Sequence, residues 1–171
     1  MSISNAKIVV AADSRTTLVG PRPDGKLEVK GYDDCACKMT QLTPTILFAA
    51  DGETASPLSP PVDILYDAHK LAKSAARNYK PVKKQEEMLG GRIAAIAARW
   101  AWDIDFRMHH GFEAGWKPID TLEGIFVGLE PNGETAIAVA KLTYPKPQGG
   151  MKVPPVAFTV GTLQSTPKDF T

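Results

Sequence analysis

Unbroken apolar runs near the beginning of the chain predict buried β-strands. The first run, Lys7–Ala12, leads directly into Asp13-Ser14-Arg15. A run of this kind, rich in Val and Ile, is typical of a strand that is buried on both faces. Weak alternation over Lys38–Leu42 and an apolar run over Thr45–Ala50, which ends at Asp51-Gly52, predict two further strands. Because charged groups at the end of a buried strand need partners close to the core, such an end is a place for a site.

Turn-forming residues separate these strands and precede the first helical pattern. Residues 18–34 contain several Gly and Pro residues and read as a polar loop, in which Asp24-Gly25 is a possible hairpin turn. Residues 55–61 carry three prolines and two serines and predict a second loop.

The period of the apolar residues changes from two to between three and four after Val62, which predicts helices. One helical face is formed by Leu65, Ala68, Ala72, Ala75, Ala76 and Tyr79, and Pro81 ends this helix. A second helix is predicted from about Gln85 to Phe106, although Gly90-Gly91 near its start weakens that helix or permits close packing.

Strand patterns return in the last third of the chain. Leu122–Gly128 and Glu134–Ala140 flank a turn containing Asn132-Gly133, which is a strong hairpin signal. A final strand is predicted over Val156–Val160. The order β, β, β, α, α, β, β, β predicts a single α+β domain over residues 1–171, with two helices covering one face of an antiparallel sheet.

Composition narrows the classes of function. The 171 residues have a formal net charge of +1, which gives no electrostatic reason to expect nucleic acid or anionic lipid as a partner. No apolar segment approaches the roughly 20 residues of a membrane span, and the beginning of the chain lacks the apolar region of a signal peptide. We therefore expect a cytoplasmic protein that does not bind membranes. Cys35 and Cys37 lie too close in sequence for a bridge between them or a four-ligand zinc site, and we expect no metal and no cofactor.

Three segments in a fixed order resemble the proteasome-type N-terminal nucleophile hydrolases. They are Ile8–Thr17 (IVVAADSRTT), Cys37–Leu42 (CKMTQL) and Ile46–Gly52 (ILFAADG). The resemblance is most specific over residues 6–54 and continues in the order of elements to about Gly161. It implies an oligomeric hydrolase or protease, of the threonine peptidase kind, that acts on a peptide or another amide. In this family an N-terminal Thr, Ser or Cys attacks the carbonyl, and its own free amine accepts the proton.

The resemblance also implies roles for individual residues. Lys38 takes the role of the buried lysine that lowers the pKa of the nucleophile, and Asp13 that of the aspartate that keeps this lysine charged and oriented. The backbone N–H of Gly52 would supply the oxyanion hole. Arg15 would support the same strand end, and Thr162 could stand where the family has a small hydroxyl beside the amine.

Both ends of the sequence depart from the family pattern. Only Met1–Ala6 precede the first strand, so the segment that begins with the nucleophile is missing as written, and Ser2 falls in register with the middle of that segment. After Thr171 the family continues with a second helix pair that completes an α-β-β-α sandwich, so we expect a truncated domain and an incomplete sandwich. Three interpretations stay open: a hydrolase whose true start lies upstream, where a signal peptide could also be encoded; a non-catalytic scaffold subunit; and an inactive fragment.

Other clusters of polar and aromatic residues have simpler interpretations. Asp103, Asp105, His109 and His110 fit no standard zinc spacing and are expected at a solvated helix end. We expect Trp100, Trp102 and Trp116 to occupy core or helix-packing positions and His69 to lie on the surface of the first helix.

Overall fold

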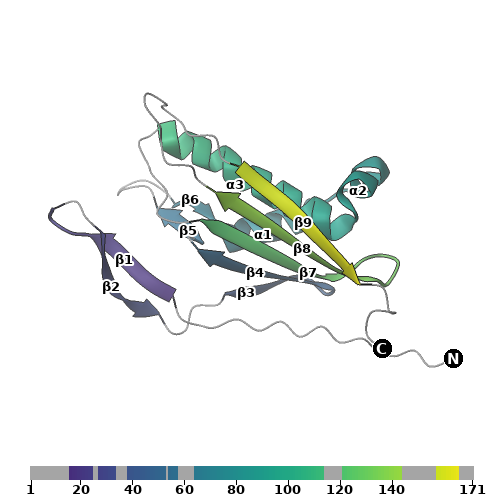
Figure 1. The fold of residues 1–171 in the computed structure, drawn as a ribbon, viewed down its shortest axis with the longest axis horizontal. Helices are drawn as coiled ribbons and strands as arrows, with labels where there is room; N and C mark the ends of the chain where they lie inside the picture. The colour runs from purple at the N-terminus through teal and green to yellow at the C-terminus, as the bar shows by residue number, and fades with distance from the viewer. Residues whose placement is uncertain are drawn as a thin grey trace.

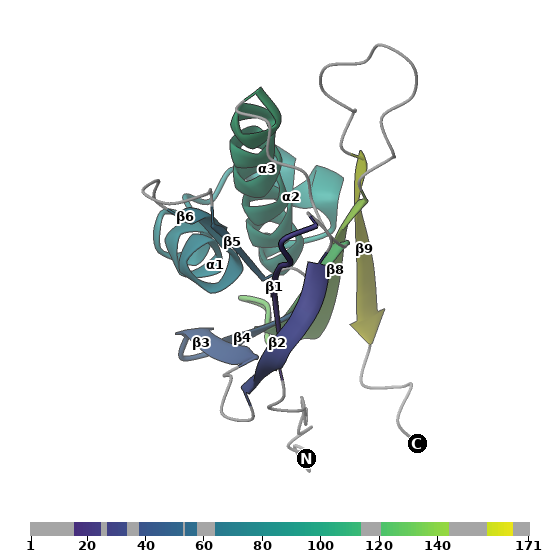
Figure 2. The ribbon, with the colours of Figure 1, turned by 90° about the vertical axis from the view of Figure 1, so that its left-hand side faces the viewer.

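The protein has an α+β fold in which an antiparallel sheet packs against helices (Figures 1 and 2). The structure, a computed structural model, describes residues 16–24, 27–33, 38–52, 54–57, 64–113, 121–143 and 157–165. The main sheet has the strand order β3-β4-β7-β8-β9. Its strands are β3 (Met39–Thr43), β4 (Ile46–Gly52), β7 (Leu122–Leu129), β8 (Thr135–Thr143) and β9 (Ala157–Ser165). The helices are α1 (Ala68–Arg77), α2 (Lys83–Leu89) and α3 (Arg92–Glu113).

Two small hairpins accompany the main sheet. One pairs β1 (Thr16–Pro21) with β2 (Leu27–Asp33), and the other pairs β5 (Ala55–Pro57) with β6 (Ile64–Asp67). Figure 1 shows the β1–β2 hairpin projecting from one end of the molecule. The second hairpin leads directly into α1, so it sets the position at which that helix begins.

The hydrophobic core lies between the sheet and the helices α1 and α3. Alternate residues of the three central strands are buried, and the aromatic rings of Phe48 and Phe126 meet Trp100 of α3 there. Small buried residues on α3, such as Ala97 and Ala101, allow this helix to lie close to its neighbours. The Nε1–H group of Trp100 donates a hydrogen bond to the carbonyl of Ala68 at 2.9 Å, which ties the first residue of α1 to the middle of α3.

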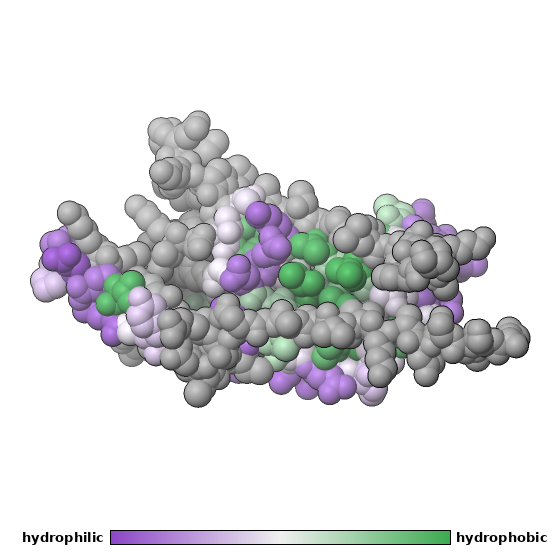
Figure 3. Space-filling view, turned by 60° about the horizontal axis from the view of Figure 1, so that its bottom comes forward, coloured by the Kyte–Doolittle hydropathy of each residue, from purple (hydrophilic) through white to green (hydrophobic). Residues whose placement is uncertain are grey.

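The opposite face of the sheet is apolar but only partly covered. Leu47 is 38% exposed, and Ile125, Ile137 and Val139 are half-buried although they project from central strands. Figure 3 views the molecule from this side and shows apolar atoms gathered in the middle of the view. Helices therefore cover one face of the sheet in the described part of the chain.

A carboxylate fixes the start of α3. Both oxygens of the buried Glu130, in the turn after β7, accept hydrogen bonds, from the N–H of Arg92 at 3.0 Å and from the N–H of Ile93 at 2.9 Å. The guanidinium of Arg92 donates in return to the carbonyl of Leu129 at 2.6 Å. Since the first N–H groups of a helix have no partner within it, Glu130 satisfies two of them and places its charge at the positive end of the helix dipole.

The predicted strands from Lys38 to Ala50 and from Leu122 to Val160 are confirmed within a few residues, and so is the turn at Asn132-Gly133. The predicted loop over residues 18–34 is wrong for its described part, because β1 and β2 pair as antiparallel strands. The possible hairpin turn agrees with this pairing, although Gly25 itself lies outside the described residues. The first predicted strand, Lys7–Ala12, lies outside the described residues.

The helical predictions need two corrections. The helix predicted from Gln85 to Phe106 is two helices, because Gly90 and Gly91 have φ angles of 80° and 134°, where a helix cannot continue. The first helix begins only at Ala68, since the side chain of Asp67 caps it by accepting a hydrogen bond from the N–H of Lys70 at 2.9 Å. No helix in the described ranges is long and apolar enough to cross a membrane.

Candidate functional site

Lys38 and Gly52 lie at the same end of two neighbouring strands. Met39 pairs with Ala49 in the antiparallel β3–β4 ladder, and the carbonyl of Lys38 accepts a hydrogen bond from the N–H of Ala50 at 3.3 Å. Gly52 is the last residue of β4, two residues beyond Ala50, or about 7 Å along the strand. Lys38 is half-buried, and its backbone immediately precedes β3. The fold therefore brings together two of the residues that the sequence singles out.

The backbone at Gly52 has a conformation that favours glycine. Its φ angle is 87°, and a Cβ built there would lie 1.8 Å from the backbone oxygen of Thr121. In the β4–β7 ladder, the N–H of Leu129 donates to the carbonyl of Thr45 at 3.0 Å, and hydrogen-bonded pairs follow at every second residue. By this alternation the N–H of Gly52 faces away from β7, toward the side where Lys38 precedes β3. A carbonyl oxygen approaching that side would meet a backbone donor.

Near this end of the sheet, a threonine of β3 contacts a histidine of α1. The Oγ1 atom of Thr40 lies 2.9 Å from Nδ1 of His69, and the His69 ring meets Phe48 edge-on, with the ring centroids 5.2 Å apart. The prediction that His69 is a surface residue is therefore wrong. Its position in the second place of α1, over β3, is set by the cap at Asp67, and the apolar spacing of the sequence carries no sign of this contact.

Burial lowers the pKa of His69 below its usual value of 6.5; Lys73 acts in the same direction and Asp67 opposes it. The unfolded chain therefore takes up this proton at a higher pH than the folded protein does. We expect the free energy of unfolding to fall as the pH is lowered from 7 to 5.5, because stability is lost below the unfolded pKa of a group whose folded pKa is depressed. Urea unfolding at several pH values measures this slope.

The His69→Gln variant is expected to show a flatter slope than the wild type over that range. His109→Gln is the matched control, since the side chain of His109 is about half exposed near the end of α3. An unchanged slope in His69→Gln, or an equal change in both variants, would contradict the assignment of the pH dependence to His69.

Comparison with known proteins does not assign the chain to a family. No family model, no curated protein and no solved structure matches the chain.

The other residues predicted for the site lie elsewhere. Asp13 and Arg15 are outside the described residues, so the structure does not place them. Thr162 is in β9, opposite Ala138, at the far edge of the sheet. Four strand spacings separate β9 from β3, or about 19 Å. The structure therefore does not bring Thr162 to Lys38 and Gly52.

The acidic and histidine cluster of α3 is divided between separate contacts. Asp103 binds Arg99 at 3.0 Å, Asp105 faces His109 at 3.3 Å, and His110 meets the ring of Phe106. Among the described residues, no group of three His, Cys, Asp or Glu side chains is arranged to hold a metal ion.

The predictions for the three tryptophans have different outcomes. Trp100 is fully buried, as predicted. Trp102 is 49% exposed, which corrects the prediction that it occupies a packing position. Trp116 lies outside the described residues.

Proposed function

We propose that this protein is an amide-bond hydrolase of the proteasome-like, N-terminal nucleophile type, acting on a peptide or another amide. The observation that carries the proposal is the placement of Lys38 and Gly52 at one end of adjacent antiparallel strands. The order of strands and helices, with α1 and α3 on one face of the sheet, agrees with the order of elements that the resemblance implies as far as about Gly161. The resemblance adds Asp13 as the partner of Lys38.

The proposed chemistry assigns each group one task. The hydroxyl or thiol of an N-terminal Thr, Ser or Cys adds to the amide carbonyl, and its proton passes to the free α-amine. The N–H of Gly52 donates to the oxyanion, and Lys38 lowers the pKa of the nucleophile. The C–N bond then breaks and the amine product leaves with the proton. Water hydrolyses the resulting ester or thioester and regenerates the nucleophile.

The proposal also accounts for the partly covered face of the sheet. In a sandwich of the proteasome type, a second antiparallel sheet packs on the face opposite the helices. Leu47, Ile125 and Val139 are apolar and incompletely covered on that face, as the inner surface of such a sandwich requires.

Acylation by a fluorescent β-lactone tests the proposed activity, because a lactone carbonyl reacts with the nucleophile and leaves a stable ester or thioester. The protein as produced in its native host should be labelled, and Lys38→Met should react about 10–10³ times more slowly, because a neighbouring charge shifts a pKa by about 1–3 units. Lys141→Met is the matched control, since Lys141 is about half exposed and its ammonium lies 3.7 Å from the carboxylate of Glu123. Circular dichroism establishes that each variant is folded.

Two results would contradict the proposed activity. Equal labelling of the wild type and Lys38→Met would remove Lys38 from the chemistry. A folded native protein that is not labelled at all would favour the non-catalytic scaffold of the same fold.

A further inference from the structure

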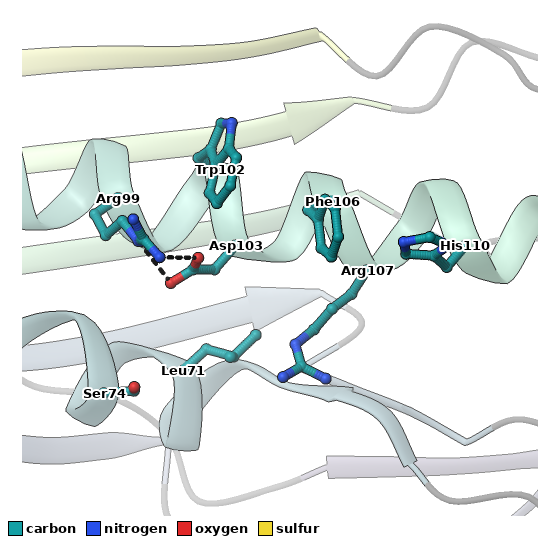
Figure 4. Close-up of a pocket in the computed structure, with 8 residues that line it drawn as sticks. All are labelled: Leu71, Ser74, Arg99, Trp102, Asp103, Phe106, Arg107 and His110. Carbon is teal, nitrogen blue, oxygen red and sulfur yellow. Dashed lines mark hydrogen bonds and ion pairs between the residues drawn. The ribbon is translucent and has the colours of Figure 1, made fainter.

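A cleft of about 510 Å³ runs between α1 and α3 on the outer side of the helical layer, away from the sheet (Figure 4). Leu71 and Ser74 of α1 form one wall. The other wall is the stretch of α3 from Arg99 to His110. This stretch is about 16 Å long, or three helical turns. The cleft is therefore long and open rather than a closed pocket.

An aromatic row occupies the α3 wall. Trp102 is 49% exposed and Phe106 is 53% exposed, and their rings stack at an angle of 19° with centroids 5.8 Å apart. The ring of His110 meets Phe106 edge-on at 4.7 Å, and the guanidinium of Arg99 lies 4.9 Å from the Trp102 ring centroid. Two large apolar side chains exposed next to each other on one helix face form a contiguous apolar patch, and such patches mark interaction sites more often than isolated apolar residues do.

The ring faces in this row are turned toward one another. Phe106 stacks on Trp102 from the following turn, and Arg99 covers Trp102 from the preceding turn. The ring edges therefore line the cleft. Nucleic-acid bases need an accessible ring face on which to stack, so the geometry disfavours them. Ring edges and the side chain of Leu71 suit apolar side chains that enter from another helix.

The rims of the cleft carry an excess of positive charge. On α1 the exposed residues Lys70, Lys73 and Arg77 flank Ser74 at helical spacing. On α3, Arg99 and Arg107 are also exposed. Among the described residues the acids on these rims are fewer: Asp103 binds Arg99 at 3.0 Å, and Asp67 binds Lys70 at 3.4 Å. The chain as a whole has a formal charge of only +1, so this surface concentrates charge that the composition does not reveal.

We propose that the cleft between α1 and α3 binds an acidic amphipathic helix of another protein. Apolar side chains of that helix pack on the Trp102–Phe106 row, and its flanking carboxylates face Arg107 and the basic rims (Figure 4). A second copy of this chain fits less well. To fill the cleft, a second copy would have to present one of its own helices. The exposed side of α1 is itself basic, and α2 has only seven residues, none of them buried. Like charges facing each other across an interface oppose association.

Fluorescence anisotropy with two designed peptides tests this proposal on the full chain. Each labelled 18-residue peptide has leucines at helical i, i+3, i+4 and i+7 spacing; one carries Glu on its flanks and the other carries Lys. The Glu peptide should bind at least about ten times more tightly than the Lys peptide, and added salt should weaken its binding. The double variant Trp102→Ser/Phe106→Ser and the variant Arg107→Glu should each weaken it by at least about tenfold.

Met88→Ser is the matched control, because Met88 is 77% exposed on α2 and lies outside the cleft. It should bind the Glu peptide as the wild type does. Equal binding of both peptides, no binding, or binding that the cleft variants leave unchanged would overturn the proposal. A dimer that forms with rising concentration and is lost in the double variant would identify a second copy, rather than a partner helix, as the occupant of the cleft. Binding of oligo-dT that is tighter than binding of the Glu peptide would identify nucleic acid as the occupant.

Discussion

Replacing Trp100 with alanine is expected to lower the free energy of unfolding by about 3–5 kcal/mol, the range for removing a large aromatic residue from a core. Trp100 is 0% exposed and lies at the centre of the contact between α3 and the sheet, with its ring centroid 5.4 Å from Phe48 and 5.6 Å from Phe126. The change also removes the donor to the carbonyl of Ala68, so α1 loses its tie to α3. Urea denaturation monitored by circular dichroism measures the loss.

Two further variants separate the ring from its hydrogen bond. Trp100→Phe keeps most of the apolar volume but removes the hydrogen bond to the carbonyl of Ala68, which costs about 0.5–1.5 kcal/mol because this carbonyl keeps its bond from the N–H of Ala72 within α1. Trp102→Ala, two positions away on the same helix, should cost less than about 1 kcal/mol because half of that side chain is already exposed. Similar losses in Trp100→Ala and Trp102→Ala would contradict the position of the core.

Replacing Glu130 with alanine is expected to lower the free energy of unfolding by about 2–4 kcal/mol. The change leaves the N–H groups of Arg92 and Ile93 without acceptors at the buried start of α3, and it removes a negative charge from the positive end of the helix dipole. Gly91 belongs to the same arrangement, because a Cβ built there would lie 2.6 Å from Oε1 of Glu130. Thermal and urea unfolding measure the loss.

Glu134→Ala is the matched control for Glu130. Glu134 follows it in the same turn, and its side chain accepts a hydrogen bond from the exposed Asn132 at 2.8 Å. It should cost less than about 1 kcal/mol. Glu130→Gln keeps an oxygen acceptor for one of the two N–H groups and should fall between the two. A cost for Glu130→Ala no larger than that for Glu134→Ala would show that Glu130 does not fix the start of α3.

Local patterns in the sequence predict the central strands because these are apolar over continuous runs and are bounded by strong turn residues. The Asn132-Gly133 hairpin is the clearest case, since one dipeptide specifies the turn between β7 and β8. The break between α2 and α3 is harder to predict from the sequence. Two adjacent glycines are compatible with a weak helix as well as with a stop, and the buried cap that decides between them, Glu130, is 38 residues further along the chain.

Some contacts of the candidate site can likewise be predicted from the sequence, and others cannot. An antiparallel pair of strands joined by a short turn necessarily brings its two outer ends together, so the proximity of Lys38 and Gly52 follows from the strand predictions. The contact between Thr40 and His69 does not, because it depends on how α1 packs across β3. The basic and aromatic cleft is equally hidden, since the net charge of the chain averages over α1 and α3. Packing between elements, rather than the elements themselves, determines these features.

The most direct measurement is peptide mapping by mass spectrometry of the native protein after it has reacted with the β-lactone. If Lys38 and Gly52 belong to an N-terminal nucleophile site, one acyl group per chain should appear on the residue that carries the free α-amine, and that residue should be Thr, Ser or Cys. The adduct should be absent from folded Lys38→Met treated for the same time. A different N-terminal residue, or an acyl group found only on an internal side chain, would contradict the proposed hydrolase.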